Sequence, residues 1–303
     1  MSAKLTILGA GSALPTRINF PTSQVLQLRD KQYMIDCGEG TQIRIRQMGL
    51  RINRLGHIFI SHLHGDHCFG LIGLISSFGM LKRTADLYIH GPIGIASLFE
   101  SHINFFCEGL SFKIIFEEFN ANVHALIYED NSVEVFSIPL KHRVPCSGFL
   151  FKEKPLERHI IREMIDFHQI PIAKIHLIKK GEDFVNSDGT LIPNSVLTTE
   201  ADKSVSYAYC SDTAYSEKIL KWINDVDLLY HEATFLETEK NRAKTTMHST
   251  AAQAATIAKK ANVSRLIIGH FSARYHNQSI LLDEAKSVFE NTVLGEDMKT
   301  YEF

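Results

Sequence analysis

The sequence of 303 residues has few cysteines and no long apolar run. Its cysteines, Cys37, Cys68, Cys107, Cys146 and Cys210, are odd in number, scattered and without a Cys-x-x-Cys pair. This distribution argues against a disulfide framework and against a cysteine zinc site, and it indicates a reducing cytoplasm. No apolar stretch approaches the ~20 residues of a membrane span. The first residues favour a strand over a signal peptide, so we expect a cytoplasmic protein without a membrane partner.

A large excess of charge of one sign is also missing. The formal net charge is −2, so any surface that attracts nucleic acid must be local. Hydrophobic residues at 45% and charged residues at 22% are ordinary for a soluble globular enzyme. Repeats and low-complexity tracts are absent, and the length admits one large domain or two small ones. The unusual count is 15 histidines, which matter where they cluster.

The densest histidine cluster is Ser-His-Leu-His-Gly-Asp-His at 61–67. It follows an apolar run at 55–60 that is typical of a buried strand, and it precedes a stretch at 68–81 that favours a helix. His62 and His64, two apart on an extended loop, would point the same way and bind one metal ion. Asp66 and His67, where the helix begins, would bind a second. Imidazole and carboxylate ligands suit zinc and similar ions, although a histidine-rich polar loop is the simpler alternative.

Strand and helix patterns alternate along most of the chain. Strands are expected at 4–9, 23–29, 31–36, 55–60, 87–92, 112–119, 124–128, 132–140, 204–209, 227–230 and 265–269. Helices are expected at 43–50, 68–81, 94–105, 156–167, 214–223, 249–262 and 279–291. This order predicts an α/β fold of two sheets packed face to face with helices outside. Residues 152–195 break the pattern, so we expect a single domain over 1–303 with an inserted arm at 152–195.

Three more strands end in a polar residue that could bind metal. They precede His142, Asp212 and His270, and a two-sheet fold gathers such strand ends at one rim. Singly, each would more often be a capping or hydrogen-bonded group. Because Asp212 has two carboxylate oxygens, it could bridge a pair of ions of the kind used in phosphoryl chemistry. The expected ligands are His62, His64 and His142 for one ion, Asp66, His67 and His270 for the other, and Asp212 between them.

These residues and several flanking motifs resemble the metallo-β-lactamase superfamily and, within it, the ribonuclease Z family. The resemblance covers essentially the whole chain and implies a four-layer αββα sandwich with an exosite arm. The histidine cluster marks only the superfamily, whereas the motifs at 231–234, 248–250 and 270–275 point to ribonuclease Z. The segments that carry the resemblance are 9–17, 36–42, 61–67, His142, 211–213, 231–234, 248–250 and 270–275.

The resemblance implies a zinc-dependent endoribonuclease that removes the 3′ trailer from precursor tRNA. Two Zn2+ per subunit would activate a water for attack on phosphorus, with Asp66 as proton acceptor. The products would be a 3′-hydroxyl on the tRNA and a 5′-phosphate on the trailer. The family also implies a homodimer.

The leaving group needs a proton donor, and His248 oriented by Glu232 is the candidate. A carboxylate beside an imidazole favours the protonated, acidic form. The simpler alternative is that Glu232 and His248 only cap neighbouring segments. Arg274, four residues beyond His270, would hold a phosphate oxygen, or else form a surface salt bridge.

The arm is locally basic. Residues 141–180 contain nine Lys or Arg and four acids, a local charge of +5 in a chain of net charge −2. Such a surface suits a tRNA bound through its phosphates, although a solvated helix with a basic face would look similar. The Gly-Pro turn of the family is replaced by Ile170–His176. The arm residues expected to contact tRNA are Lys154, Arg158, Lys179 and Lys180.

Two other functions stay open at this stage. One is a small-molecule phosphodiesterase with the same two-metal centre, for which a basic arm would have no use. The other is a catalytically inactive RNA-binding protein, against which the full ligand set argues. The sequence leaves open how precursors that contain CCA are handled, and whether manganese or iron replaces zinc.

Overall fold

The computed structural model describes residues 3–51 and 54–303 and confirms the α/β fold class. Contacts divide the chain into two compact units. The larger comprises Met1–Asp130, Glu134–Lys152 and Val205–Phe303, and the second comprises Asn131–Val133 and Glu153–Ser204. The second unit overlaps the segment 152–195, which was expected as an arm, and continues to Ser204. No helix in the described ranges is long and apolar enough to cross a membrane.

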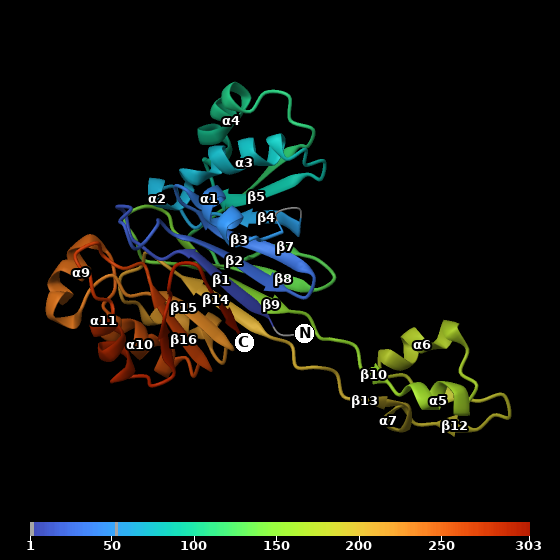
Figure 1. Cartoon of the computed structure of the whole chain (residues 1–303). Helices are drawn as coiled ribbons and strands as arrows, with labels where there is room; N and C mark the ends of the chain where they lie inside the picture. Colours follow the sequence, from blue (N-terminus) through green and yellow to red (C-terminus); the bar gives the residue numbers. More distant parts are fainter. Residues whose placement is uncertain (1–2, 52–53) are drawn as a thin grey trace. The chain divides into compact units, whose positions relative to one another are not determined.

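The larger unit contains two seven-stranded sheets within the described residues (Figure 1). The first has the order β18 (Lys299–Glu302), β1 (Lys4–Gly9), β2 (Ser23–Leu28), β3 (Lys31–Cys37), β4 (Leu55–Phe59), β5 (Leu87–Pro92), β6 (Ile114–Phe119). The second has the order β17 (Thr292–Leu294), β16 (Arg265–Gly269), β15 (Leu228–Glu232), β14 (Ser206–Cys210), β9 (Ser147–Glu153), β8 (Val133–Pro139), β7 (Leu126–Glu129). Strands β3 to β6 and strands β14 to β17 run parallel, so their carboxyl ends share an edge.

Aromatic side chains fill the space between the sheets. Phe151 of β9 lies 5.2 Å from Phe59 of β4 and 5.7 Å from Tyr33 of β3, measured between ring centroids. Helices cover the outer faces, which gives the expected four-layer αββα order (Figure 1). The helices associated with the first sheet are α1 (Thr41–Gln47), α2 (Gly65–Cys68), α3 (Gly70–Met80) and α4 (Ile95–Phe106). Those associated with the second are α8 (Leu220–Ile223), α9 (Lys240–Thr246), α10 (Ala251–Lys260) and α11 (Ser279–Lys286), with short 3-10 turns at Glu217–Ile219 and Glu237–Glu239.

The second unit has a small core of its own. It contains two short hairpins, β10 (His159–Ile160) with β13 (Thr198–Thr199) and β11 (Phe184–Val185) with β12 (Leu191–Ile192). Its helices are α5 (Arg162–Phe167), α6 (Ile172–Lys179) and α7 (Asn194–Leu197). Apolar side chains of these elements pack together, among them Ile178, Phe184 and Leu197. The buried amide of Asn194 donates to the carbonyls of Ile178 and Glu182, at 2.6 and 2.8 Å.

Several elements differ from the expected boundaries. The helix expected at 68–81 is α3, which begins at Gly70, and the short helix α2 precedes it within the histidine cluster; the helix expected at 156–167 begins only at Arg162. Strand β9 was not expected, because its residues Ser147–Phe151 are buried without alternation. Helices α6 and α9 and strands β17 and β18 were also missed, since they are short and take their stability from packing.

Candidate metal centre and active site

Four ligand-type side chains converge at the rim where strands β4, β8 and β14 end. The His62 Nε2 atom lies 2.9 Å from His64 Nδ1, and His142 Nε2 lies 3.4 Å from the same atom. The Asp212 Oδ2 atom lies 3.6 Å from His62 Nε2 and 3.7 Å from His142 Nε2. Three nitrogens and one oxygen therefore face one small volume, as a metal ion requires.

A second group lies on the other side of Asp212. The Asp212 Oδ1 atom lies 2.9 Å from His270 Nε2 and 3.3 Å from His67 Nε2. The Asp66 Oδ2 atom lies 3.5 Å from His67 Nε2 and 3.8 Å from His270 Nε2. The two oxygens of Asp212 face different groups, so this carboxylate lies within reach of both. The structure thus brings together all seven residues that were expected to bind metal.

The chemistry of this centre fits divalent cations. Among the described residues, the buried Nε2 atoms of His67 and His270 find no partner with hydrogen-bond geometry, whereas buried polar atoms are nearly always paired. Burial lowers the pKa values of His62, His64 and His142, which favours the neutral, ligating imidazole.

The carboxylates at this centre require positive charge nearby. Burial works against protonation of His67 and His270, yet Asp212 and its neighbours raise both pKa values, that of His270 to about 10. A divalent cation at the same place would supply that charge without a proton.

Backbone geometry at the strand ends aims the ligands. Asp212 lies just after the end of β14 and has a φ angle of 57°. His270 directly follows β16 and has a φ angle of 58°. Such left-handed conformations are uncommon for residues other than glycine and gather at functional sites. On the other sheet, a Cβ on Gly70 would lie 2.1 Å from the carbonyl oxygen of Gly38. Only glycine allows this approach, which seats α2 and α3, and with them Asp66, against the end of β3.

Hydrogen bonds orient the imidazoles, and sequence reasoning missed the residues that form them. The Asp36 Oδ2 atom lies 2.7 Å from His67 Nδ1 and also accepts from Ser61 Oγ at 2.9 Å. The Thr234 Oγ1 atom lies 3.0 Å from His270 Nδ1. A hydrogen-bond partner at Nδ1 fixes the orientation of the imidazole ring, so that Nε2 is available to bind a metal ion. The sequence did contain an indication for Asp36, because this residue lies at the end of the strand expected at 31–36, much as Asp212 lies just after a strand.

Glu232, which is buried, and His248, which is half-buried, form a pair beside the second group. The His248 Nδ1 atom lies 2.9 Å from Glu232 Oε1. Burial disfavours protonated His248, but the Glu232 carboxylate outweighs it and raises the His248 pKa. The backbone amides of Thr213 and Ser249 also donate to Glu232, at 2.7 and 3.0 Å. Glu232 therefore connects the segments that contain Thr213 and Ser249. It also polarises the imidazole of His248.

A hollow of 250 Å3 opens onto the ligands. His64, Asp66 and His248 line it, together with the guanidinium groups of Arg143, Arg242 and Arg274. Arg274 is ion-paired with Glu239, and its Nε donates to Ser272 Oγ at 3.1 Å. The backbone N–H of Ala13 donates to Asp66 Oδ2 at 2.8 Å, which fixes that carboxylate at the hollow.

The arm cations lie in the second unit in different environments. Arg158 pairs with Glu200 at 2.8 Å and donates from Nε to Thr198 Oγ1 at 2.8 Å. Lys179 Nζ lies 3.1 Å from Glu157. Lys180 is exposed, and Lys154 is half-buried.

Comparisons with known proteins identify relatives of this chain along its full length. It is 56% identical over 294 residues to ribonuclease Z of Bacteroides fragilis, covering 97% of each chain. It is 56% identical over 293 residues to ribonuclease Z of Parabacteroides distasonis, covering 97% of this chain and 96% of the relative. The family model described as anti-Pycsar protein Apyc1 also matches residues 3–135.

Solved structures share the fold. The short form of human tRNase Z superposes with a TM-score of 0.72 at 24% identity, covering 98% of both chains. A diphosphatase from the PhnP family superposes with a TM-score of 0.66 at 15% identity, covering 100% of this chain and 98% of the other. These likenesses support the fold, whereas the full-length relatives above half identity define the family. The chain belongs to the ribonuclease Z family.

Proposed function

We propose that this protein is a metal-dependent endoribonuclease that cleaves the 3′ trailer from precursor tRNA. The cut would leave a 3′-hydroxyl on the tRNA and a 5′-phosphate on the trailer. The observation that carries the proposal is the Glu232–His248 pair beside a seven-ligand centre, in a chain that belongs to the ribonuclease Z family. A leaving alkoxide needs a proton donor, and this pair supplies one.

Two Zn2+ per subunit are the proposed cofactors. His62, His64 and His142 would hold one ion and Asp66, His67 and His270 the other, and Asp212 would reach both. Divalent ions in such a pair of sites activate water near neutral pH and offset charge on phosphate oxygens.

The side chains around the centre would manage protons. Asp66 is the proposed proton acceptor, since its carboxylate opens onto the hollow while the Ala13 N–H fixes Oδ2. His248 is the proposed general acid, with Glu232 as a positioning residue that keeps Nδ1 engaged. Proton transfer from a positioned acid of this kind contributes about 10²–10⁴-fold.

Cations would bind the RNA backbone. Arg274 lines the hollow, and its pairing with Glu239 supports a fixed guanidinium that faces phosphate. In the second unit, Lys154, Arg158, Lys179 and Lys180 are the proposed tRNA contacts. Contacts to phosphate would select the shape of the tRNA and not its sequence.

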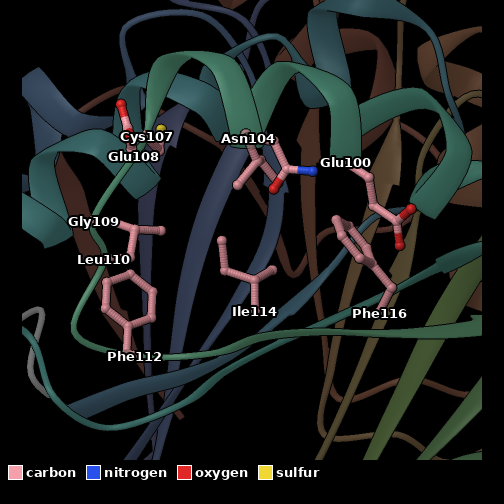
Figure 2. Close-up of a pocket in the computed structure, with 10 residues that line it drawn as sticks. Glu100, Asn104, Cys107, Glu108, Gly109, Leu110, Phe112, Ile114 and Phe116 are labelled. Atoms are coloured by element: carbon pink, nitrogen blue, oxygen red, sulfur yellow. The ribbon is translucent and has the colours of Figure 1, made fainter.

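A homodimer is proposed on the basis of helix α4. Phe105 and Phe106 of α4 are 79% and 60% exposed. A hollow of 500 Å3 lies between α4 and β6, the last strand of its sheet, as Figure 2 shows with Phe112 and Phe116 along its floor. Exposed apolar surface of this kind marks protein contacts, and a second copy of the chain would cover it. Phe105→Ser should then yield monomers in sedimentation equilibrium, whereas Phe167→Ser in the arm should not.

A cytoplasmic location is proposed from the cysteines. All five are free and buried, as expected for a protein of a reducing compartment.

Incubation with a 3′-extended precursor tRNA, with and without chelator, tests the proposed function. Cleavage at the end of the acceptor stem that chelation abolishes is expected. Absence of cleavage with zinc present, or cleavage insensitive to chelator, would refute it. Deletion of residues 155–195 should lower tRNA cleavage sharply while sparing bis(p-nitrophenyl) phosphate hydrolysis. Equal loss on both substrates would contradict the role of the arm, and a wild-type enzyme active only on the small ester would support the phosphodiesterase alternative.

A further inference from the structure

A second hollow adjoins the metal centre on the side of the loop that carries His142. Its volume is 540 Å3, and it shares His142 and Arg143 with the hollow over the ligands. The loop at 139–145 forms one side and the segment at 216–222 forms the other. The residues just before the second segment are bonded to the first, because Ala214 N donates to Lys141 O at 2.9 Å and Lys141 N donates to the side-chain Oγ1 of Thr213 at 3.2 Å. The hollow is therefore built on the same loops as the metal ligands.

The lining of this hollow carries positive charge without a carboxylate. Lys141, Arg143 and Lys218 line it, all three are exposed, and no Asp or Glu is among its lining residues. In the described part of the chain, none of these three cations lies within ion-pair distance of an acid. The neighbouring Glu217 is engaged by Lys260 Nζ at 2.5 Å. Three uncompensated cations in one concavity favour an anionic ligand with more than one charge.

Besides the polar residues Asn122, His142 and Ser216, the lining contains apolar side chains, of which Trp222 is held in position. Trp222 is half-buried, and its ring stacks on His124 with centroids 4.9 Å apart and planes at 24°. The His124 ring is held in turn by a contact of 2.6 Å between Nδ1 and Ser137 O. Pro139 and Val144 extend this apolar wall. Apolar surface beside cations suits a single-stranded nucleic acid, because its bases can contact the apolar side chains while its phosphates bind the cations.

We propose that this hollow, the trailer pocket, binds the first nucleotides of the single-stranded trailer beyond the scissile phosphate. The inference rests on the proposed function and assigns that site a subsite for the trailer, the strand that keeps the scissile phosphate. An acceptor stem is a duplex, whose bases are already stacked, whereas a trailer offers free base faces and flexible phosphates. Arg143 lines both hollows. An RNA strand that passes from the metal centre into the trailer pocket would therefore stay in contact with a positively charged surface.

The chain provides its own probe, because Trp222 is its single tryptophan. Titration of chelator-treated protein with a single-stranded oligoribonucleotide of about six nucleotides, within the site size of such grooves, should change the tryptophan fluorescence. Lys218→Glu should weaken this binding about tenfold and reduce its salt dependence. Lys113→Glu, an exposed lysine that lies outside the trailer pocket, is the matched control and should bind like the wild type.

Cleavage kinetics supply the second readout. Precursor tRNAs with a trailer of one nucleotide and of about six nucleotides are compared, since only the longer reaches through the trailer pocket. Lys218→Glu should raise KM for the longer precursor about tenfold more than for the shorter. Equal effects on both precursors, or fluorescence that does not respond to RNA, would overturn the proposal. Cleavage of the one-nucleotide precursor by the wild type tests the proposed function separately.

Discussion

Replacing His248 with alanine tests the proton donor of the proposed reaction. His248 lines the hollow over the metal ligands, and its Nδ1 is held 2.9 Å from a fully buried Glu232. An alkoxide leaving group needs a proton in the transition state, whereas p-nitrophenolate leaves without one. His248→Ala should therefore slow RNA cleavage far more than hydrolysis of bis(p-nitrophenyl) phosphate.

The size of the effect follows from the role assigned to the imidazole. General acid catalysis contributes about 10²–10⁴-fold, so kcat on precursor tRNA should fall by that factor, equivalent to roughly 3–5 kcal/mol. Hydrolysis of the activated ester should fall less than about tenfold, since only positioning is lost. His102→Ala, an exposed histidine of α4, is the matched control and should change neither rate.

The pH profile gives an independent readout of the same group. Glu232 raises the pKa of His248, so the acidic form persists above the ordinary histidine range, and RNA cleavage falls as pH rises through that pKa. Glu232→Gln removes the carboxylate charge and should move this alkaline limb to lower pH. Equal slowing of both substrates by His248→Ala, with an unmoved limb in Glu232→Gln, would refute the general-acid assignment.

Two further predictions concern buried groups. Asp36→Asn should weaken zinc binding by about 10–100-fold in competition with a chromophoric chelator, because Asp36 orients His67; unchanged affinity would contradict that role. Burial lowers the pKa of His57 to about 4 and that of His90 to about 3, so both stay neutral in the fold while the unfolded chain takes up protons below pH 6.5. The contribution of each histidine to the free energy of unfolding should be fully present above that pH and should be about 2 kcal/mol smaller at pH 5. Urea unfolding at pH 7 and pH 5 measures the loss, and equal midpoints would contradict it.

The convergence of the seven proposed ligands was predictable because each of them follows a recognisable strand. Parallel strands end at a common edge, so β14, β15 and β16 bring Asp212, Glu232 and His270 together whatever their distance in sequence. Within the histidine cluster, spacing separated His62 and His64 from Asp66 and His67, whereas spacing did not decide the groups of His142 and His270. The fold class followed from the same alternation of strands and helices.

The parts that escaped prediction depend on contacts between distant residues. Strand β9 has a continuous buried run and no alternation, and the orienting role of Thr234 depends on a partner 36 residues away. The trailer pocket needs the loop at 139–145 and the segment at 216–222 side by side, which periodicity does not show. A salt bridge of Arg274 was an expected alternative, but its partner, Glu239, was identified only by the structure.

Anomalous diffraction at the zinc edge, on crystals grown with zinc, tests the central claim of a two-ion centre most directly. Two peaks are predicted, one among His62, His64 and His142 and the other among Asp66, His67 and His270. The carboxylate of Asp212 should contact both. A single peak, or peaks away from these side chains, would contradict the account.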